Sequence, residues 1–235
     1  MKKLIIILLL FPSVCLAAVN YADSFSGDTL DPKWTGRVLM GSGSYTVSGG
    51  CLNIQAVSGG GASAYEVYMA GIALPCNIFI KFTESGTIHP ANQTVLNCYK
   101  TAPQVDDMGI MSVNNTTAYS VKNLGATGGS QTMGASPFYF NVIIDGSGVM
   151  TVKTKNGAGT WVTCTPPNGP INFGSGTFTI GLTCIAGTGT MNSHIEWIND
   201  SDSDPDTPTP TPTPTPETPQ RGFWSWKDNG FYTWP

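Results

Sequence analysis

The acidic residues are the first candidates for chemistry, because hydrolysis of a glycosidic bond requires two carboxyl groups held about 5 to 10 Å apart. If both lie on one β-strand, the two residues must be two positions apart in the sequence, since alternate side chains share a face. Glu66, Glu84 and Glu196 have no acidic residue two positions away. Asp106 and Asp107 are adjacent, so they would point to opposite faces of a strand. We therefore expect a protein without enzymatic activity, although a carboxylate pair assembled from different strands stays open.

Other catalytic and metal-binding patterns are absent from the sequence. It contains no G-x-S-x-G nucleophile motif, no P-loop and no dinucleotide-binding fingerprint. The two histidines, His89 and His194, are far apart, and no recognisable motif surrounds either of them. The cysteines form no C-x-x-C pair of the kind that binds zinc. Acid–base catalysis by histidine and a zinc site are therefore not predicted.

Aromatic and loop-forming polar residues indicate a binding site instead. A tyrosine combines an apolar ring with a polar tip, and carboxylate or amide oxygens can hydrogen-bond to sugars or coordinate calcium. The candidate ligand-binding residues are Tyr65, Tyr68, Tyr99, Asp106, Asp107, Asn114, Tyr119 and Trp161. An ordinary role in packing or in a solvated loop is the alternative for each. Trp34 and Trp197, near the two ends of the β-rich region, are expected to pack in the core.

The C-terminal stretch FWSWKDNGFYTWP is the densest aromatic segment, with six aromatic residues in thirteen. A three-residue loop at 228–230 would make it a hairpin with four large rings on one face, whereas a two-residue Asn-Gly loop would divide them. The four rings are Trp224, Trp226, Tyr232 and Trp234. Because dense exposed aromatic patches mark interaction sites, we expect this tail to dock to a surface component or a neighbouring subunit. Glycan contact, and folding back onto the protein's own core, are the alternatives.

Segments of different composition divide the chain into four parts. Residues 1–18, MKKLIIILLLFPSVCLAA, have the two lysines, the short apolar run and the small residues of a secretory signal peptide. The apolar run is shorter than the ~20 residues that a membrane span requires. Residues 19–200 are expected to form one β-domain, 201–219 a linker and 220–235 the aromatic tail. The protein is thus predicted to be secreted or displayed at the cell surface, with no membrane span in the mature chain.

The linker joins an acidic stretch, SDSDPD, to the Thr-Pro repeat TPTPTPTPTPETP. Alternating proline favours an extended chain of about 3 Å per residue. The alternating aspartates at 200, 202, 204 and 206 suggest calcium, but the glycine that turns a calcium-binding loop is missing. A solvated acidic linker is therefore favoured; no cofactor is expected, and calcium stays a possibility.

The overall charge argues against several partners. The net charge is −4 and only 11% of the residues are charged. A surface of this kind lacks the basic patch that nucleic acid or anionic lipid requires. We expect no nucleic-acid partner.

The region 19–200 has the pattern of an all-β domain, because short alternating runs recur between Gly, Asn, Asp and Pro clusters. The clearest hairpin is FYFNVIIDGSGVMTVKT, with DGSG as its turn. SYTVSGGCLNIQA predicts two short strands around Gly49-Gly50, and CNIFIKF predicts a strand with Ile78, Ile80 and Phe82 on one face. The stretch 113–136 has a weak strand signal and is expected to contain loops with one or two edge strands. Many short strands predict a sandwich or a barrel.

Five cysteines follow the predicted signal peptide, and an exported protein can oxidise them. Two pairs are each symmetric about a turn region, Cys76 with Cys98 and Cys164 with Cys184. They are candidate cross-strand disulfides, subject to the geometry that such bridges require. Buried thiols are the alternative, and Cys51 is the expected unpaired residue.

The order of several motifs resembles a known family. DSFSGDTLDPKW, YTVSGGCLNIQA, FYFNVIIDGSGVMTVKTKNGAGTWV, FTIGLTC and HIEWIND follow one another over residues 20–200. Together they are similar to the concanavalin A-like lectin/glucanase superfamily, in particular its secreted bacterial laminin-G-like members. The resemblance implies a jelly-roll sandwich of two antiparallel sheets, one of them concave. It also implies that glycans bind on the concave face and its rim loops, sometimes beside calcium.

The combined prediction is a secreted, non-catalytic recognition or adhesion protein that binds carbohydrate or another cell-surface component. One alternative is a structural subunit of an extracellular fibre or coat, whose tail engages a neighbouring copy. A second is a glycoside hydrolase that lacks the usual motif.

Overall fold

The computed structural model describes residues 21–87, 89, 91–100, 108–113, 118–123, 126–132, 137–157, 159–164 and 171–202. These residues form two antiparallel β-sheets. The seven-stranded sheet has the order β1 (Thr35–Met40), β4 (Ser63–Ala73), β14 (Thr177–Ala186), β6 (Gln93–Tyr99), β7 (Met108–Val113), β8 (Ala118–Asn123) and β9 (Ala126–Thr132). The eight-stranded sheet contains β12 (Val162–Cys164), β11 (Val149–Asn156), β10 (Phe138–Ile144), β5 (Cys76–Gly86), β15 (Gly189–Asn199), β3 (Leu52–Ser58) and β2 (Ser42–Val47), with β13 (Ile171–Asn172) paired to β11.

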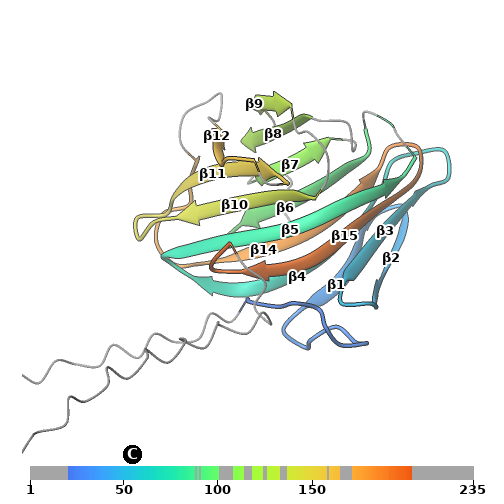
Figure 1. Cartoon of the computed structure of the whole chain (residues 1–235), viewed down its shortest axis with the longest axis horizontal. Coiled ribbons are helices and arrows are strands. Elements are labelled where there is room, and N and C mark those ends of the chain that lie inside the picture. Colours follow the sequence, from blue (N-terminus) through green and yellow to red (C-terminus); the bar gives the residue numbers. More distant parts are fainter. Residues whose placement is uncertain are drawn as a thin grey trace, which may run out of the picture.

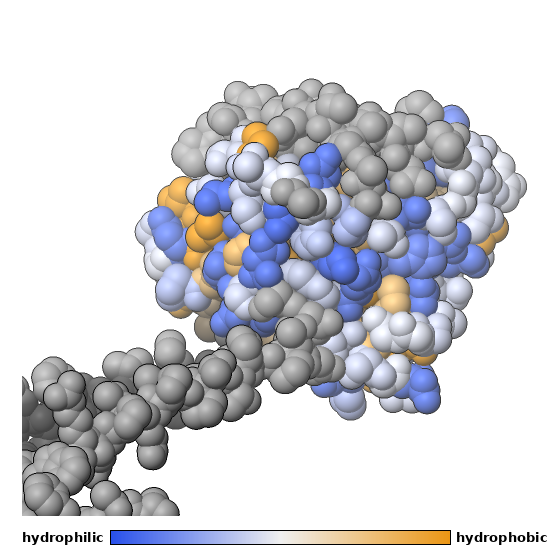
Figure 2. Space-filling view, in the orientation of Figure 1, coloured by the Kyte–Doolittle hydropathy of each residue, from blue (hydrophilic) through white to orange (hydrophobic). Residues whose placement is uncertain are grey.

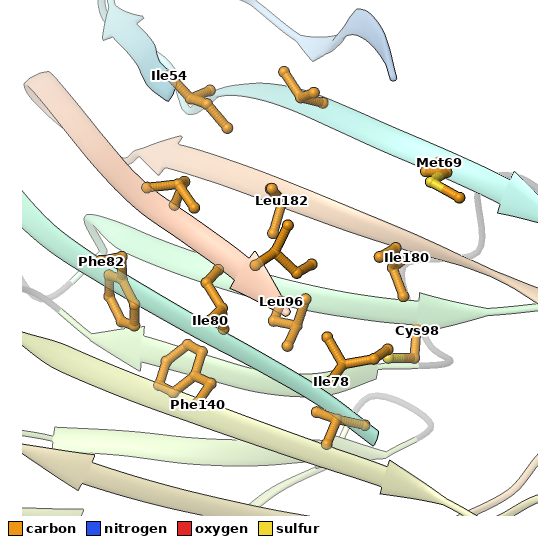
Figure 3. Close-up of a cluster of buried hydrophobic side chains, with 14 of the residues drawn as sticks. Ile54, Met69, Ile78, Ile80, Phe82, Leu96, Cys98, Phe140, Ile180 and Leu182 are labelled. Atoms are coloured by element: carbon orange, nitrogen blue, oxygen red, sulfur yellow. The ribbon is translucent and has the colours of Figure 1, made fainter. Parts of the chain in front are cut away.

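The two sheets stack face to face and enclose one hydrophobic core (Figure 1). Ile78, Ile80 and Phe82 of β5 point from the eight-stranded sheet toward Leu96 of β6 and Leu182 of β14 in the other sheet (Figure 3). Alternation explains this arrangement, because every second side chain of a strand reaches the same face. The predicted all-β sandwich and the predicted inward face of CNIFIKF are confirmed.

The predicted hairpins are present in the structure. In the first, β10 pairs with β11 from Phe138 opposite Asn156 to Ile144 opposite Met150. The second joins β2 to β3 through Gly49 and Gly50, whose φ angles of 61° and 70° are those that glycine adopts at little cost. Within 113–136 lie β8 and β9, and β9 is the edge of its sheet. This outcome matches the expectation of one or two edge strands there.

The proposed hairpin disulfides are wrong, because the strands that carry them do not pair. Cys76 begins β5 in the eight-stranded sheet, whereas Cys98 lies on β6 in the seven-stranded sheet. Cys164 on β12 and Cys184 on β14 are likewise in different sheets. None of the cysteines in the described part of the chain, Cys51 included, is disulfide-bonded. Burial raises the pKa of the Cys184 thiol to about 11, which keeps it protonated at neutral pH.

Both tryptophans expected in the core are buried, but only Trp34 lies in the core cluster. Trp34 belongs to the core cluster, and its indole N–H donates to Asp23 Oδ2 at 2.9 Å. Trp197 follows an irregularity in β15 and contacts Tyr139 on the outer face of the eight-stranded sheet, with ring centroids 6.2 Å apart. The described surface on the side of β10, β5 and β15 is mainly hydrophilic, with scattered apolar residues (Figure 2).

The predicted signal peptide, most of the linker and the aromatic tail lie outside the described residues. In the part that is described, no helix has the length and apolarity to cross a membrane.

Candidate functional site

A buried carboxylate lies on the outer face of the seven-stranded sheet, on the second strand from one edge. Glu66 is on β4, between β1 and β14, opposite Arg37 on one side and Thr183 on the other. Its neighbours along the strand, Tyr65 and Val67, point into the core, so alternation places Glu66 outside. The Glu66 side chain is nevertheless only 1% exposed. Its surroundings must therefore replace the water that an ionised carboxylate would otherwise bind.

Five donors do so. Oε2 accepts hydrogen bonds from Arg37 Nε at 2.8 Å, from Arg37 Nη2 and from the Tyr99 hydroxyl at 3.1 Å. Oε1 accepts from Asn97 Nδ2 at 3.1 Å and from Thr183 Oγ1 at 3.2 Å. Every lone-pair direction of the carboxylate is thus occupied by a protein group.

Gly181 provides the space for this carboxylate. It lies on β14 between Tyr68 and Asn97, and a Cβ atom at this position would overlap Glu66 Oε1. A glycine in a strand interior often marks such a close approach of another group. Any larger residue would therefore displace Glu66 from its donors.

Arg37 connects the buried carboxylate to the surface. Its side chain is 22% exposed, and its guanidinium carbon lies 4.2 Å from the ring centroid of Tyr68 and 5.8 Å from that of Tyr99. Arg37 Nη2 also donates to the Tyr99 hydroxyl at 2.6 Å. Burial, together with the negative charge of Glu66, raises the pKa of Tyr99 far above its usual range, so Tyr99 stays protonated and donates to Glu66.

Two polar groups of this face have unused hydrogen-bonding capacity within the described part of the chain. Asn97 Oδ1 is buried without a partner there, while Nδ2 of the same side chain donates to Glu66 and to Thr183 Oγ1. Arg37 uses Nε and Nη2 on Glu66 and Tyr99, and its Nη1 has no partner among the residues described. We call Arg37, Glu66, Tyr68, Asn97 and Tyr99 the Glu66 face.

The structure separates the tyrosines that the sequence grouped together. Tyr68 and Tyr99 belong to the Glu66 face. Tyr65 points inward and contacts Tyr45, with ring centroids 6.1 Å apart, so it is not part of the Glu66 face. Tyr119 lies on β8 of the same sheet, and only its backbone position is described. Asp106, Asp107, Asn114 and the four tail residues lie outside the described residues.

Trp161 belongs to a different surface. It lies on the outer side of the eight-stranded sheet, where its ring contacts Phe79 at 5.5 Å and Tyr139 at 6.4 Å between centroids. The Lys155 ammonium lies 4.8 Å from the Trp161 ring centroid and forms an ion pair with Asp202. Trp161 Nε1 donates to the same carboxylate at 3.2 Å. These contacts attach Asp202, near the start of the acidic linker, to the sandwich, so Trp161 is partly covered by its own chain.

Arg37, Glu66, Asn97 and Thr183 were not among the residues singled out from the sequence. The signal was present in E-V-Y and N-C-Y, where Glu66 with Tyr68 and Asn97 with Tyr99 stand two apart around an inward residue. A search for pairs of carboxylates does not detect this signal, because Glu66 has no acidic residue two positions away. As for metals, the described residues contain no group of three or more His, Cys, Asp or Glu side chains that could hold an ion.

Comparison with solved structures identifies the fold. No family model and no curated protein matches the sequence. The carbohydrate recognition domain of Emp47p is similar over 76% of this chain and 92% of its own, with a TM-score of 0.51 and 14% identity. The exoplasmic/lumenal domain of VIP36, in a form bound to Ca²⁺ and Man2, covers 78% of this chain and 88% of its own, with a TM-score of 0.50 and 13% identity.

The catalytic domain of an endo-1,3-beta-glucanase (laminarinase) from Thermotoga petrophila RKU-1 has a TM-score of 0.54 at 12% identity. It covers 78% of this chain and 98% of its own. At such identities the similarity concerns the fold alone, and it agrees with the two antiparallel sheets and their shared core. The protein therefore has the concanavalin A-like jelly-roll fold that its sequence motifs predicted.

Proposed function

We propose that this is an exported carbohydrate-binding protein and that the Glu66 face is its binding surface. By their own descriptions, two of the similar structures are a carbohydrate recognition domain and a domain in a Ca²⁺/Man2-bound form. The Glu66 face adds the chemistry that suits a sugar. It combines the Tyr68 ring and the Arg37 Nη1 donor in one network that the buried Glu66 carboxylate holds on the outer face of a sheet.

The saturated Glu66 carboxylate is the observation that favours binding over hydrolysis. A nucleophile or general base needs a lone pair directed at substrate or water. Glu66 directs both oxygens at Arg37, Tyr99, Asn97 and Thr183. Its role is to hold these side chains in place, so that donors and acceptors are already oriented when a ligand arrives.

Replacing Tyr68 by alanine is expected to weaken glycan binding at least about tenfold, because a well-packed aromatic contact contributes more than about 1.4 kcal/mol. The measurement is a glycan array on residues 19–202, followed by titration of the best ligand against the wild type and the variant. Tyr45→Ala is the matched control, since Tyr45 is an exposed tyrosine of β2 outside the Glu66 face. Equal loss in both variants, or none in Tyr68→Ala, would place the sugar elsewhere.

Hydrolysis is tested on the same samples. Incubation with a β-1,3-glucan such as laminarin is expected to release no reducing ends above a heat-inactivated control. Release that disappears in Glu66→Gln would reverse the proposal and make Glu66 catalytic despite its five donors.

We further propose that the signal peptide exports the protein and that the aromatic tail docks it. The support is sequence-based, namely the N-terminal MKKLIIILLL run and the four large rings at the far end of the Thr-Pro linker. In the alternative proposal, the protein is a structural subunit of a fibre or coat, and its tail binds a neighbouring copy.

Light scattering coupled to size-exclusion chromatography separates these two uses of the tail. The mature protein with and without residues 220–235 is expected to elute as monomers of the corresponding mass, because the tail engages a partner other than itself. Removal of the tail is then expected to release the protein from intact cells into the medium. Assembly of the full-length form alone would favour the structural subunit, and retention of the tail-less form on cells would exclude docking through the tail.

A further inference from the structure

Three polar side chains form a connected row on the outer face of the eight-stranded sheet, opposite to the Glu66 face. Asn53 on β3 lies directly across from His194 on β15, and Ser85 on the neighbouring strand β5 lies diagonally from it. Both arrangements are within reach of side-chain contact in an antiparallel sheet. His194 is 109 positions from Ser85 and 141 positions from Asn53 in the sequence, so no sequence motif joins the three residues.

Their hydrogen bonds define the tautomer of the histidine. Asn53 Nδ2 donates to Ser48 Oγ at 3.3 Å and to the Cys51 carbonyl at 3.4 Å, which directs Asn53 Oδ1 at His194 Nδ1. Because Oδ1 can only accept, Nδ1 carries the proton and Nε2 has the lone pair. Ser85 Oγ, 2.7 Å from Nε2, is then the donor of that contact.

The environment keeps this imidazole neutral. Burial lowers the pKa of His194 below its ordinary value, so at neutral pH the ring is an acceptor that can take a proton. The serine, by contrast, is exposed at the end of β5. The next residue, Gly86, has a φ of 115°, and a side chain there would overlap the Thr190 carbonyl, so the backbone beside Ser85 is closely determined.

A further donor lies beside the serine. Asn192 on β15 is directly opposite Ser85, and its Oδ1 accepts from Gln55 Nε2 at 2.9 Å. This contact leaves Asn192 Nδ2 as the group that can donate to a negatively charged oxygen formed next to Ser85 Oγ. A serine hydroxyl, an imidazole acceptor, an amide that orients the imidazole and a second side-chain amide therefore share one surface.

We propose that Ser85, His194 and Asn53 form an acyl-transfer centre that accepts carboxylic esters. Ser85 Oγ attacks the ester carbonyl carbon, its proton passes to His194 Nε2, and Asn192 Nδ2 donates to the resulting oxyanion. The C–O bond to the alcohol then breaks, and the alcohol leaves with the proton from Nε2. Water next attacks the acyl-serine, gives a proton to Nε2 and releases the carboxylic acid, while Nε2 returns the proton to Ser85. Asn53 acts as a positioning residue.

Active-site labelling tests this centre directly. The protein is treated with a fluorophosphonate, whose phosphorus is attacked by an activated serine with loss of fluoride, and with p-nitrophenyl acetate. The modified serine is identified by mass spectrometry of peptides. Ser85 is expected to react at least about 100-fold faster than Ser44, an exposed strand serine of β2, because general-base assistance contributes at least that factor.

Variants separate the centre from background reactivity. Ser85→Ala is expected to abolish labelling, His194→Gln to slow it about 100-fold or more and Asn192→Ala about tenfold or more, while Ser44→Ala has no effect. The melting temperature of each variant shows that the sandwich is intact. Labelling spread over several serines, or equal labelling of wild type and His194→Gln, would show that the row is an ordinary polar ladder and overturn the proposal.

Discussion

Replacing Arg37 by methionine is expected to lower the free energy of unfolding by about 3 kcal/mol, because it leaves the Glu66 carboxylate buried without its cation. Glu66 is only 1% exposed, and methionine offers no donor in place of the lost guanidinium. Two of its five hydrogen bonds also disappear. In a domain of this size the melting temperature should fall by roughly 6–12 °C, as measured by calorimetry or circular dichroism.

Lys81→Met is the matched control for this prediction. Lys81 is 25% exposed, close to the 22% of Arg37, but its partner Glu196 is 34% exposed instead of 1%. An ion pair that water can reach contributes at most about 1 kcal/mol. Similar losses in the two variants would mean that burial of Glu66 does not determine the energetics of the Glu66 face.

A double variant tests the same argument in the opposite direction. Arg37→Met combined with Glu66→Leu removes the cation together with the charge that needed it. Its stability is expected to recover by at least about 1 kcal/mol relative to Arg37→Met alone, since replacing a buried pair by apolar residues is often neutral. Glycan binding should remain lost, because the orientation of Tyr99 and Asn97 depends on the Glu66 carboxylate.

Replacing Phe82 by alanine is expected to lower the stability by about 3–5 kcal/mol, the usual cost of truncating a buried aromatic residue. Phe82 is fully buried at the centre of the core, with its ring centroid 4.6 Å from that of Phe140 and 5.6 Å from that of Phe138. All three rings come from neighbouring strands of the eight-stranded sheet, so the cavity would lie where this sheet meets the other. Denaturant titration at a constant m-value measures the loss.

Phe79→Ala is the comparison, because Phe79 lies on the same strand but on the outer face. Its ring is half-buried against Trp161. Removing it is expected to cost roughly 1–2 kcal/mol, in proportion to the smaller apolar area that leaves contact. An equal or larger loss at Phe79 would show that the outer aromatic cluster with Trp161 and Tyr139, rather than the core, limits the stability of this sheet.

These expectations assign different tasks to the two outer faces. On the seven-stranded sheet, Glu66 organises a preformed set of donors and acceptors around Tyr68 and Arg37. On the eight-stranded sheet, Ser85 and His194 occupy one end while Trp161 receives the start of the acidic linker. A glycan-binding defect caused by Tyr68→Ala and a labelling defect caused by Ser85→Ala should therefore be independent of each other.

The fold could be predicted from the sequence because its signals are local. The alternation of Ile78, Ile80 and Phe82 specified an inward face, and the turn after Ile144 specified a hairpin, each from residues adjacent in the chain. These patterns depend only on the two-residue period of a strand and on the conformations that turn residues allow. Tyr68 and Tyr99 could be proposed as candidate rings for the same reason, since their amphipathic chemistry is a property of the residue itself.

The contacts between side chains of different strands depend on which strands become neighbours, and this is a property of the tertiary structure. Consecutive strands β5 and β6 belong to different sheets, so Cys76 and Cys98 do not face each other across a hairpin. The same long-range pairing sets Glu66 against Arg37, and His194 against Asn53 and Ser85. Sequence alone thus determined which face of each strand is apolar, because that is fixed by local periodicity. Only the packing of distant strands determined which polar residues meet, because strand order is set by the closure of one shared core and leaves no local trace.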